Sequence, residues 1–212
     1  MKTDDLVQAL VADRAAVQRP IGTQLAWALG IGLVLSAAGF WHALGPRPDF
    51  VQAAGTMRFD VKVIEVVLLA ATALALVLQV GRPVPVTGWR VAALAAAPAL
   101  LVATVIAELV AVPSGQWLAR LVGTNSRVCL TAIPLMSLPL LAAFMLVLRR
   151  GAPVARTAAG AVAGLAASGL AAVLYATHCP DDSPLFVAVW YSIAIGGVTL
   201  LGAVLGRFLL RW

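Results

Sequence analysis

The two cysteines of the chain, Cys129 and Cys179, are the residues best suited to redox or metal chemistry. Two thiols can form a disulfide in an oxidising compartment if their Cα atoms come within about 4.4–6.8 Å of each other. His178 precedes Cys179 and could act as a base or as a third ligand for a soft metal ion. Because exposure and pKa decide how thiols behave, two interpretations stay open: a permanent disulfide or a reversible thiol switch.

The composition shows what kind of element must position these residues. Hydrophobic residues make up 62% of the 212 residues and charged residues 11%, against about 25% charged in a soluble domain. A soluble globule of this size could not hide so much apolar surface from water. The composition therefore excludes a soluble enzyme, a disordered regulator and a protein that reads nucleic acid through a basic surface. We interpret the net charge of +6 as a sign of membrane topology.

Six neutral apolar stretches are each long enough to cross a bilayer as a helix, which takes about 20 residues. They predict an all-α integral membrane bundle of six transmembrane helices, because helices satisfy their own backbone hydrogen bonds in lipid. Pro98 should kink or open the third helix, and Pro134 and Pro139 the fourth. The expected spans are 24–44, 61–80, 91–112, 128–148, 155–177 and 186–207.

Small residues recur every four positions in the last two spans. This spacing lets helix backbones approach closely in lipid, and we interpret it as packing within the bundle rather than as a dimer face. The residues concerned are Gly160, Gly164, Ser168 and Ala172 in one span and Gly202 and Gly206 in the other.

The basic residues are distributed unequally between the two sides of this topology. Ten of the 15 Lys and Arg residues fall on the side that holds both termini, and five fall on the other. Because short loops rich in Lys and Arg stay in the cytoplasm, we expect both termini to be cytoplasmic. Residues 1–19 lack the apolar run of a cleavable signal peptide. The chain then divides into a cytoplasmic amphipathic arm, 1–22, and a six-helix transmembrane sensor domain, 23–212.

The other ionisable residues of the spans gather at the outer, non-cytoplasmic side, the same side as both cysteines. Charges inside a bilayer cost free energy and usually face one another, so a one-sided cluster suggests a site. We expect Asp60 and Lys62 to lie at the membrane interface, whereas Glu65 and Glu108 lie deep enough to need partners. The candidate groups that support the cysteines are His42, Glu65, Glu108, His178, Asp181 and Asp182.

The arm has the pattern of a short amphipathic helix. Asp4 and Asp5 would lie in its first turn, where negative charge is favourable. A helix bound to a membrane surface usually has a basic polar face, whereas acidic residues here offset the basic ones, so a groove on a partner protein fits better. The residues expected to bind this partner are Asp4, Asp5, Leu6, Leu10 and Val11.

Several short segments resemble the NrsF family of membrane anti-sigma factors. They are TDDL at 3–6, FDVK at 59–62, Cys129, HCPDDS at 178–183, WY at 190–191 and LRW at 210–212. The resemblance covers nearly the whole chain. It implies a six-helix protein of the bacterial inner membrane whose partner is an extracytoplasmic-function sigma factor. It implies no cofactor and no direct contact with nucleic acid.

The resemblance also implies a mechanism. The cytoplasmic arm would hold the sigma factor away from RNA polymerase until stress arrives, and Cys129 and Cys179 would sense heavy metals or oxidants such as chromate and cadmium. If a metal is bound, its ligands would be Cys129, Cys179 and His178. We expect modification of a cysteine to shift helices whose inner ends frame the loop 149–156 and so to loosen the arm.

Two other classes of function remain as alternatives. A small transporter or metal-handling protein would use the outer polar cluster, with Glu65 and Glu108 as ion ligands. The nearly charge-free inner halves of the spans argue against an ion path. A membrane enzyme would need a nucleophile with a base and an orienting group at a plausible spacing, and the sequence offers none, so we expect no enzymatic activity.

Overall fold

The structure is a computed structural model that describes residues 3, 5, 7, 8, 21–81, 86–151 and 153–210. The described residues contain helices and no strand. Six helices are long and apolar enough to cross a membrane, and each matches a predicted span to within a few residues. This confirms the all-α fold of six membrane-length helices. The spans are Gly22–Ala43, Met57–Val80, Gly88–Ala111, Ser126–Leu148, Arg156–Ala176 and Pro184–Leu209.

Four of the spans are single α-helices, and two are composite. The single helices are α2 (Ile21–Ala43), α4 (Met57–Val80), α8 (Ser126–Leu148) and α9 (Arg156–Ala176). The third span consists of α5 (Gly88–Ala93) and α6 (Ala96–Ala111). The last consists of α10 (Pro184–Phe186), the π-helical segment η2 (Val187–Tyr191) and α11 (Ser192–Leu209). Three short elements that the sequence did not predict occupy the loops: α3 (Phe50–Ala53), η1 (Ser114–Gln116) and α7 (Trp117–Val122).

The prolines affect the third span and the fourth span differently. The third span is interrupted between α5 and α6, at Leu94 and Ala95. Pro98 has no N–H to bond the carbonyl of Leu94, four residues earlier, which explains the break. In contrast, α8 continues through Pro134 and Pro139, so the predicted opening of that helix does not occur.

Helix α9 is the centre of the bundle and packs against α4, α8 and α11. Its small residues meet those of α11 without a gap: the carbonyl of Gly202 occupies the space that a Cβ on Gly160 would need. A Cβ on Gly164 would likewise meet the carbonyl of Val198. The recurring small residues therefore serve helix packing within the bundle, as predicted.

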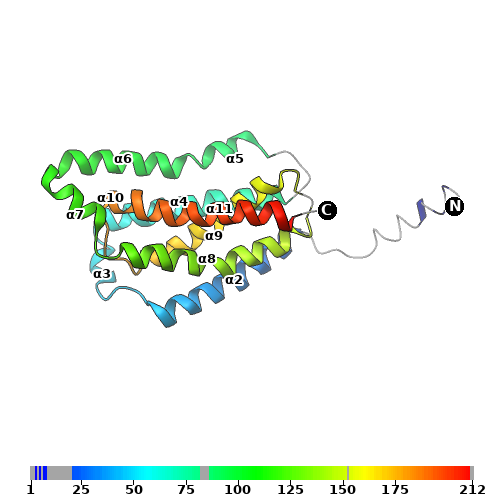
Figure 1. Cartoon of the computed structure of the whole chain (residues 1–212), viewed down its shortest axis with the longest axis horizontal. Coiled ribbons are helices and arrows are strands. Elements are labelled where there is room, and N and C mark those ends of the chain that lie inside the picture. Colours follow the sequence, from blue (N-terminus) through cyan, green and yellow to red (C-terminus); the bar gives the residue numbers. More distant parts are fainter. Residues whose placement is uncertain are drawn as a thin grey trace.

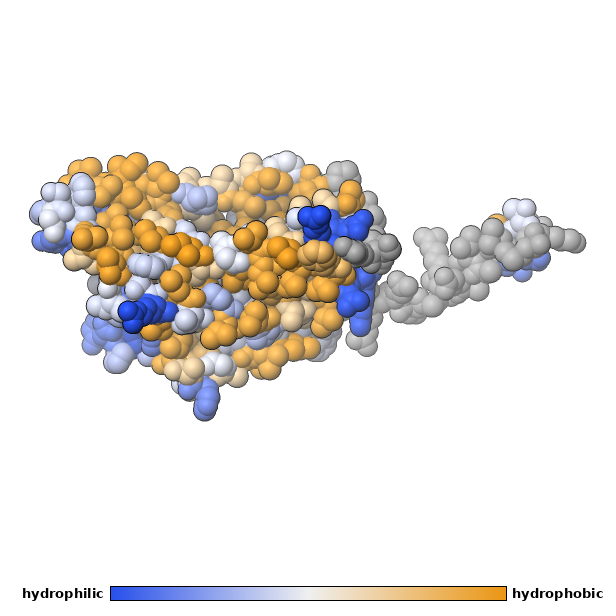
Figure 2. Space-filling view, viewed as in Figure 1, coloured by the Kyte–Doolittle hydropathy of each residue, from blue (hydrophilic) through white to orange (hydrophobic). Residues whose placement is uncertain are grey.

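The bundle has two chemically different ends separated by an apolar flank (Figures 1 and 2). Helix α2 begins and α11 ends at the same end (Figure 1). We call this the arginine end, because Arg149, Arg150, Arg156 and Arg207 lie there. The opposite end holds Cys129 and Cys179, and we call it the cysteine end. Both termini of the bundle thus face one side, which an even number of spans requires.

Candidate functional site

Both cysteines are buried in one hydrophobic cluster at the cysteine end. Cys129 lies in the first turn of α8 and Cys179 lies just after α9, and the exposed fraction of each is 0%. The cluster also contains Tyr175, Tyr191 and Phe186. Both thiols are free. The packing of α8 against α9 brings both cysteines to the same end of the bundle.

The thiol of Cys179 is sealed from solvent. It donates a weak hydrogen bond to the carbonyl of Asp181, with the sulfur 3.8 Å from the oxygen. Burial raises the pKa of this thiol, an effect that the nearby charge of Lys62 partly offsets. Because the thiolate is the reactive form, burial lowers the reactivity of Cys179.

A pair of basic side chains holds the backbone of Cys179 in place. Lys62 Nζ donates to the carbonyl of Cys179 at 2.8 Å and also to Asp182. Arg47 donates to Asp182 at 2.8 Å and to the same carbonyl at 3.4 Å. We call Arg47, Lys62 and Asp182 the clamp. It ties the Cys179 loop to the start of α4 and to the loop after α2.

The position of Lys62 corrects the expectation from sequence. We expected Lys62 at the membrane interface, but its exposed fraction is 1%. A buried ammonium needs partners, and Asp182 and the Cys179 carbonyl provide them from 120 and 117 residues away. Phe59 adds a cation–π contact, with Nζ 5.2 Å from the ring centroid. Asp60, on the same turn, is exposed as expected.

Arg47 joins the clamp to an exposed carboxylate. Its guanidinium binds Asp49 with two hydrogen bonds of 2.7 Å. These bonds raise the pKa of Arg47, and they lower the pKa of Asp49 below its usual range. The clamp arginine therefore keeps its charge at any physiological pH.

Asp181 links the Cys179 loop to the helix that carries Cys129. Its carboxylate accepts hydrogen bonds from the backbone N–H groups of Thr124, at 3.0 Å, and Asn125, at 2.8 Å. These groups precede α8, so Asp181 caps that helix in the way that a carboxylate stabilises a positive helix end. The Tyr175 hydroxyl donates to the carbonyl of Asn125 at 3.3 Å. A movement of the Cys179 loop must therefore disturb the start of α8.

The two deep glutamates have the partners that the sequence required. Glu108, 5% exposed, accepts hydrogen bonds from Arg58 at 3.0 Å and from Arg120 at 2.8 Å. Glu65 accepts one from Thr104 at 2.8 Å. Among the described residues, no three His, Cys, Asp or Glu side chains are arranged to hold a metal ion. The transporter alternative, with both glutamates as ion ligands, thus gains no support.

The two histidines lie in different surroundings. Nδ1 of His178 bonds the carbonyl of Gly45 at 2.8 Å, at a turn where Gly45 has φ +69°. His178 therefore fixes the corner after α2. His42 is exposed on the last turn of α2 and lies outside the cluster that holds the cysteines.

Sequence reasoning missed three arginines, Arg47, Arg58 and Arg120, that pair with the acidic residues of the site. A signal was available: they lie on the side that the positive-inside pattern otherwise depletes of basic residues, so each needs a counter-charge. At the other end of the chain, Asp5 is exposed and helical. The remaining residues expected to bind a partner, Asp4, Leu6, Leu10 and Val11, lie outside the described residues.

Comparisons with known proteins bear on the whole chain. A family model described as "NrsF: Negative regulator of sigma F" matches residues 10–212. The chain is 34% identical to the anti-sigma-F factor NrsF of Caulobacter vibrioides over 216 aligned residues. It is 33% identical to the probable anti-sigma-F factor NrsF of Azospira oryzae over 213 residues. Each alignment covers 100% of both chains. No solved structure matches the chain.

Proposed function

Because the chain belongs to the NrsF family of negative regulators of sigma F, we propose that it is a membrane anti-sigma factor, not an enzyme. The observation that carries this proposal is the similarity to two anti-sigma-F factors along the entire length of both chains. The target is a sigma factor of the extracytoplasmic-function type. The protein resides in the bacterial inner membrane, with its six helices in lipid and the arginine end in the cytoplasm.

The sigma factor binds the N-terminal arm, residues 1–22. This segment precedes α2, which begins at the arginine end, and the positive-inside rule assigns that end to the cytoplasm. Its apolar residues Leu6, Leu10 and Val11 form the contact surface, and Asp4 and Asp5 complement a basic partner. A helix this short is marginally stable alone and gains its order from the surface that it covers.

The cysteine end is the sensor and faces the periplasm. Free, buried thiols under a clamp form a resting state that does not react until the clamp opens. Hydrogen peroxide can then oxidise the pair: two thiols form one disulfide, and the hydrogen peroxide accepts their two electrons and two protons and leaves as two waters. A soft heavy-metal ion can instead displace the thiol protons and bind the two sulfurs.

The signal reaches the arm through α8 and α9. At the cysteine end, α8 carries Cys129 and α9 is followed by Cys179. At the arginine end, the loop after Arg149 joins the two helices. A disulfide stabilises the state that contains it by about 2–4 kcal/mol. Moving a two-state equilibrium from 1:99 to 99:1 takes about 5.5 kcal/mol. Breaking the clamp costs free energy, because hydrogen bonds to charged groups are worth about 1.5–3 kcal/mol each. Repacking of α8 and α9, or a metal ion held by several groups of the cysteine end, must therefore add the remainder.

Co-purification of the full-length protein with its sigma factor tests the inhibitory half of the proposal. The substitutions Leu6→Asp and Leu10→Asp should abolish capture of the sigma factor and release transcription of its target genes. Gln8→Asp introduces the same charge on the other face of the expected helix and should leave capture intact. Equal capture by all three variants would exclude the arm as the binding segment.

Replacement of both cysteines by serine tests the sensing half. The double variant should still bind the sigma factor and repress its targets, but it should not respond to peroxide or to a thiophilic metal ion. A normal response would remove the thiols from the mechanism and leave the inhibitory half untouched. Labelling with a membrane-impermeant thiol reagent, with and without prior reduction, reports the side and the redox state of each cysteine.

A further inference from the structure

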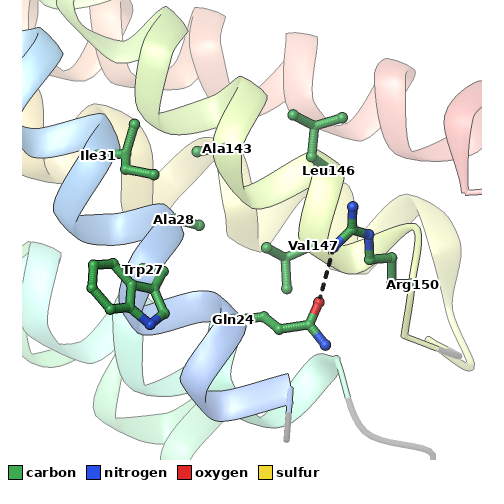
Figure 3. A pocket seen from close by; sticks show the side chains of 8 residues that line it. All are labelled: Gln24, Trp27, Ala28, Ile31, Ala143, Leu146, Val147 and Arg150. Atoms are coloured by element: carbon green, nitrogen blue, oxygen red, sulfur yellow. Dashed lines mark hydrogen bonds between the residues drawn. The ribbon is translucent and has the colours of Figure 1, made fainter. Parts of the chain in front are cut away.

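An apolar groove of about 630 Å³ runs between α2 and the end of α8, at the arginine end of the bundle (Figure 3). Trp27 and Ile31 line it from α2, and Leu146 and Val147 line it from α8. Gln24 and Arg150 lie at one end of the groove, where Arg150 Nη1 is 3.4 Å from the Gln24 amide oxygen. The groove thus has a long apolar wall and one polar end.

The groove opens on the flank of the molecule that faces lipid. Trp27, Ile31 and Leu146 have exposed fractions of 64%, 57% and 62%. Their neighbours Ala28 and Val147 are buried and form the floor. Side chains of this kind on a membrane-length helix contact acyl chains, and tryptophan is enriched where the acyl region meets the headgroups.

Among residues 21–81, 86–151 and 153–210, the polar end of the groove holds basic side chains and no carboxylate. From Ile21 to Leu210, every Asp and Glu described by the structure belongs to the cysteine half of the bundle, where the salt bridges also occur. Arg150 and the adjacent Arg149 are exposed. Gln24 offers Arg150 only a neutral amide. An anion would give Arg150 a partner of opposite charge.

We propose that the groove binds one anionic phospholipid. Its phosphate accepts hydrogen bonds from Arg150, and an acyl chain lies along Ile31 and Leu146. Basic pockets between transmembrane helices are a recurring mode of anionic lipid recognition. Here the guanidinium lies where the headgroup would bind, and the apolar wall lies along the path of the acyl chain. The lipid replaces Gln24 as the partner of Arg150.

Repulsion between like charges disfavours a second copy of this chain as the occupant of the groove. A copy seated on this face would place its own arginine end beside Arg149 and Arg150, and like charges repel. The lipid also has a position from which to act on the arm, because Gln24 lies in the first turn of α2, where the arm joins the bundle. This inference goes beyond sigma binding and does not depend on it.

Native mass spectrometry of the full-length protein tests the proposal with phosphatidylglycerol and phosphatidylcholine of identical acyl chains. The protein should retain phosphatidylglycerol preferentially. Arg150→Gln should weaken this retention about fivefold, the usual value of one basic residue at an anionic membrane surface. Arg207→Gln removes an exposed charge of the same end outside the groove and should have little effect. Leu146→Trp keeps Arg150 but fills the groove, and it should also reduce retention.

Each other result would overturn the proposal. Equal retention of both lipids would mean ordinary contact with bulk lipid. Equal losses in Arg150→Gln and Arg207→Gln would mean a diffuse basic surface. Stronger phosphatidylglycerol retention in the full-length Asp4→Asn, Asp5→Asn double variant would assign the groove to the acidic arm of the chain. Intact dimers that dissociate only in Leu146→Trp would assign it to a second copy.

Discussion

The buried ammonium of Lys62 donates a hydrogen bond of 2.8 Å to the carbonyl of Cys179, 117 residues further along the chain. The bond fixes the backbone of a cysteine whose thiol is completely buried. Because the carbonyl and the thiol belong to one residue, the clamp controls access to the sulfur without contacting it. Access to Cys179 therefore depends on residues far from it in sequence.

We expect Lys62→Met to open the clamp while preserving most of the side-chain volume. Asp182 keeps Arg47 as a partner, so the free energy of unfolding should fall by only about 1–3 kcal/mol. N-ethylmaleimide should label Cys179 at least several times faster than in the unaltered protein. Asp60→Asn, an exposed change on the same turn, should alter neither quantity. Unchanged protection of Cys179 in Lys62→Met would refute the role of the clamp.

The raised pKa of Cys179 predicts a pH dependence of both reactivity and stability. Labelling should stay slow at neutral pH and rise only above the usual thiol range of about 8.5. Between the pKa of Cys179 in the unfolded state and its higher pKa in the native state, the native state binds more protons. The contribution of this thiol to stability is therefore complete below about pH 8.5, and it is lost as pH rises toward the native pKa. Labelling rates and unfolding measured from pH 7 to 10 check both trends. A labelling profile centred on the ordinary thiol pKa would contradict them.

Glu108→Gln should destabilise the protein, because it removes the shared counter-charge of Arg58 and Arg120. Both arginines are partly exposed, so we expect a cost of about 1–3 kcal/mol rather than the larger cost of a fully buried pair. A double-mutant cycle with Arg120→Gln should show that the two substitutions together cost less than the sum of the two alone. Asp49→Asn, at an exposed ion pair, is the control and should cost less than about 1 kcal/mol.

Gly160→Ala should separate α9 from α11, since the new Cβ would meet the carbonyl of Gly202. Overpacking of this kind typically costs about 1–3 kcal/mol. The matched control is Gly30→Ala in α2, where nothing lies within 4 Å of the new methyl group. Thermal unfolding in detergent should show a loss for Gly160→Ala and none for Gly30→Ala. Equal behaviour of the two variants would contradict the close approach of the helices.

The spans could be predicted because the bilayer imposes a length and a composition that each stretch satisfies locally. The packing role of Gly160 and Gly202 also follows from local spacing. The clamp could not be predicted in this way, because Lys62 resembles an interface lysine until its partners in the Cys179 loop are known. The capping of α8 by Asp181 is equally non-local, since 56 residues separate Asp181 from Asn125. What the sequence did indicate was the side of the bundle on which these groups meet.

The third span is attached to the bundle unevenly. Only 11% of its most apolar window is buried, and its polar ties, Glu108 to Arg58 and Thr104 to Glu65, belong to α6. Lateral pressure from the bilayer acts along the whole length of this span, whereas the ties restrain one portion of it. We therefore expect bending of this span to concentrate at Leu94 and Ala95, where the helix is interrupted, while its ties hold α6 against α4 at the cysteine end.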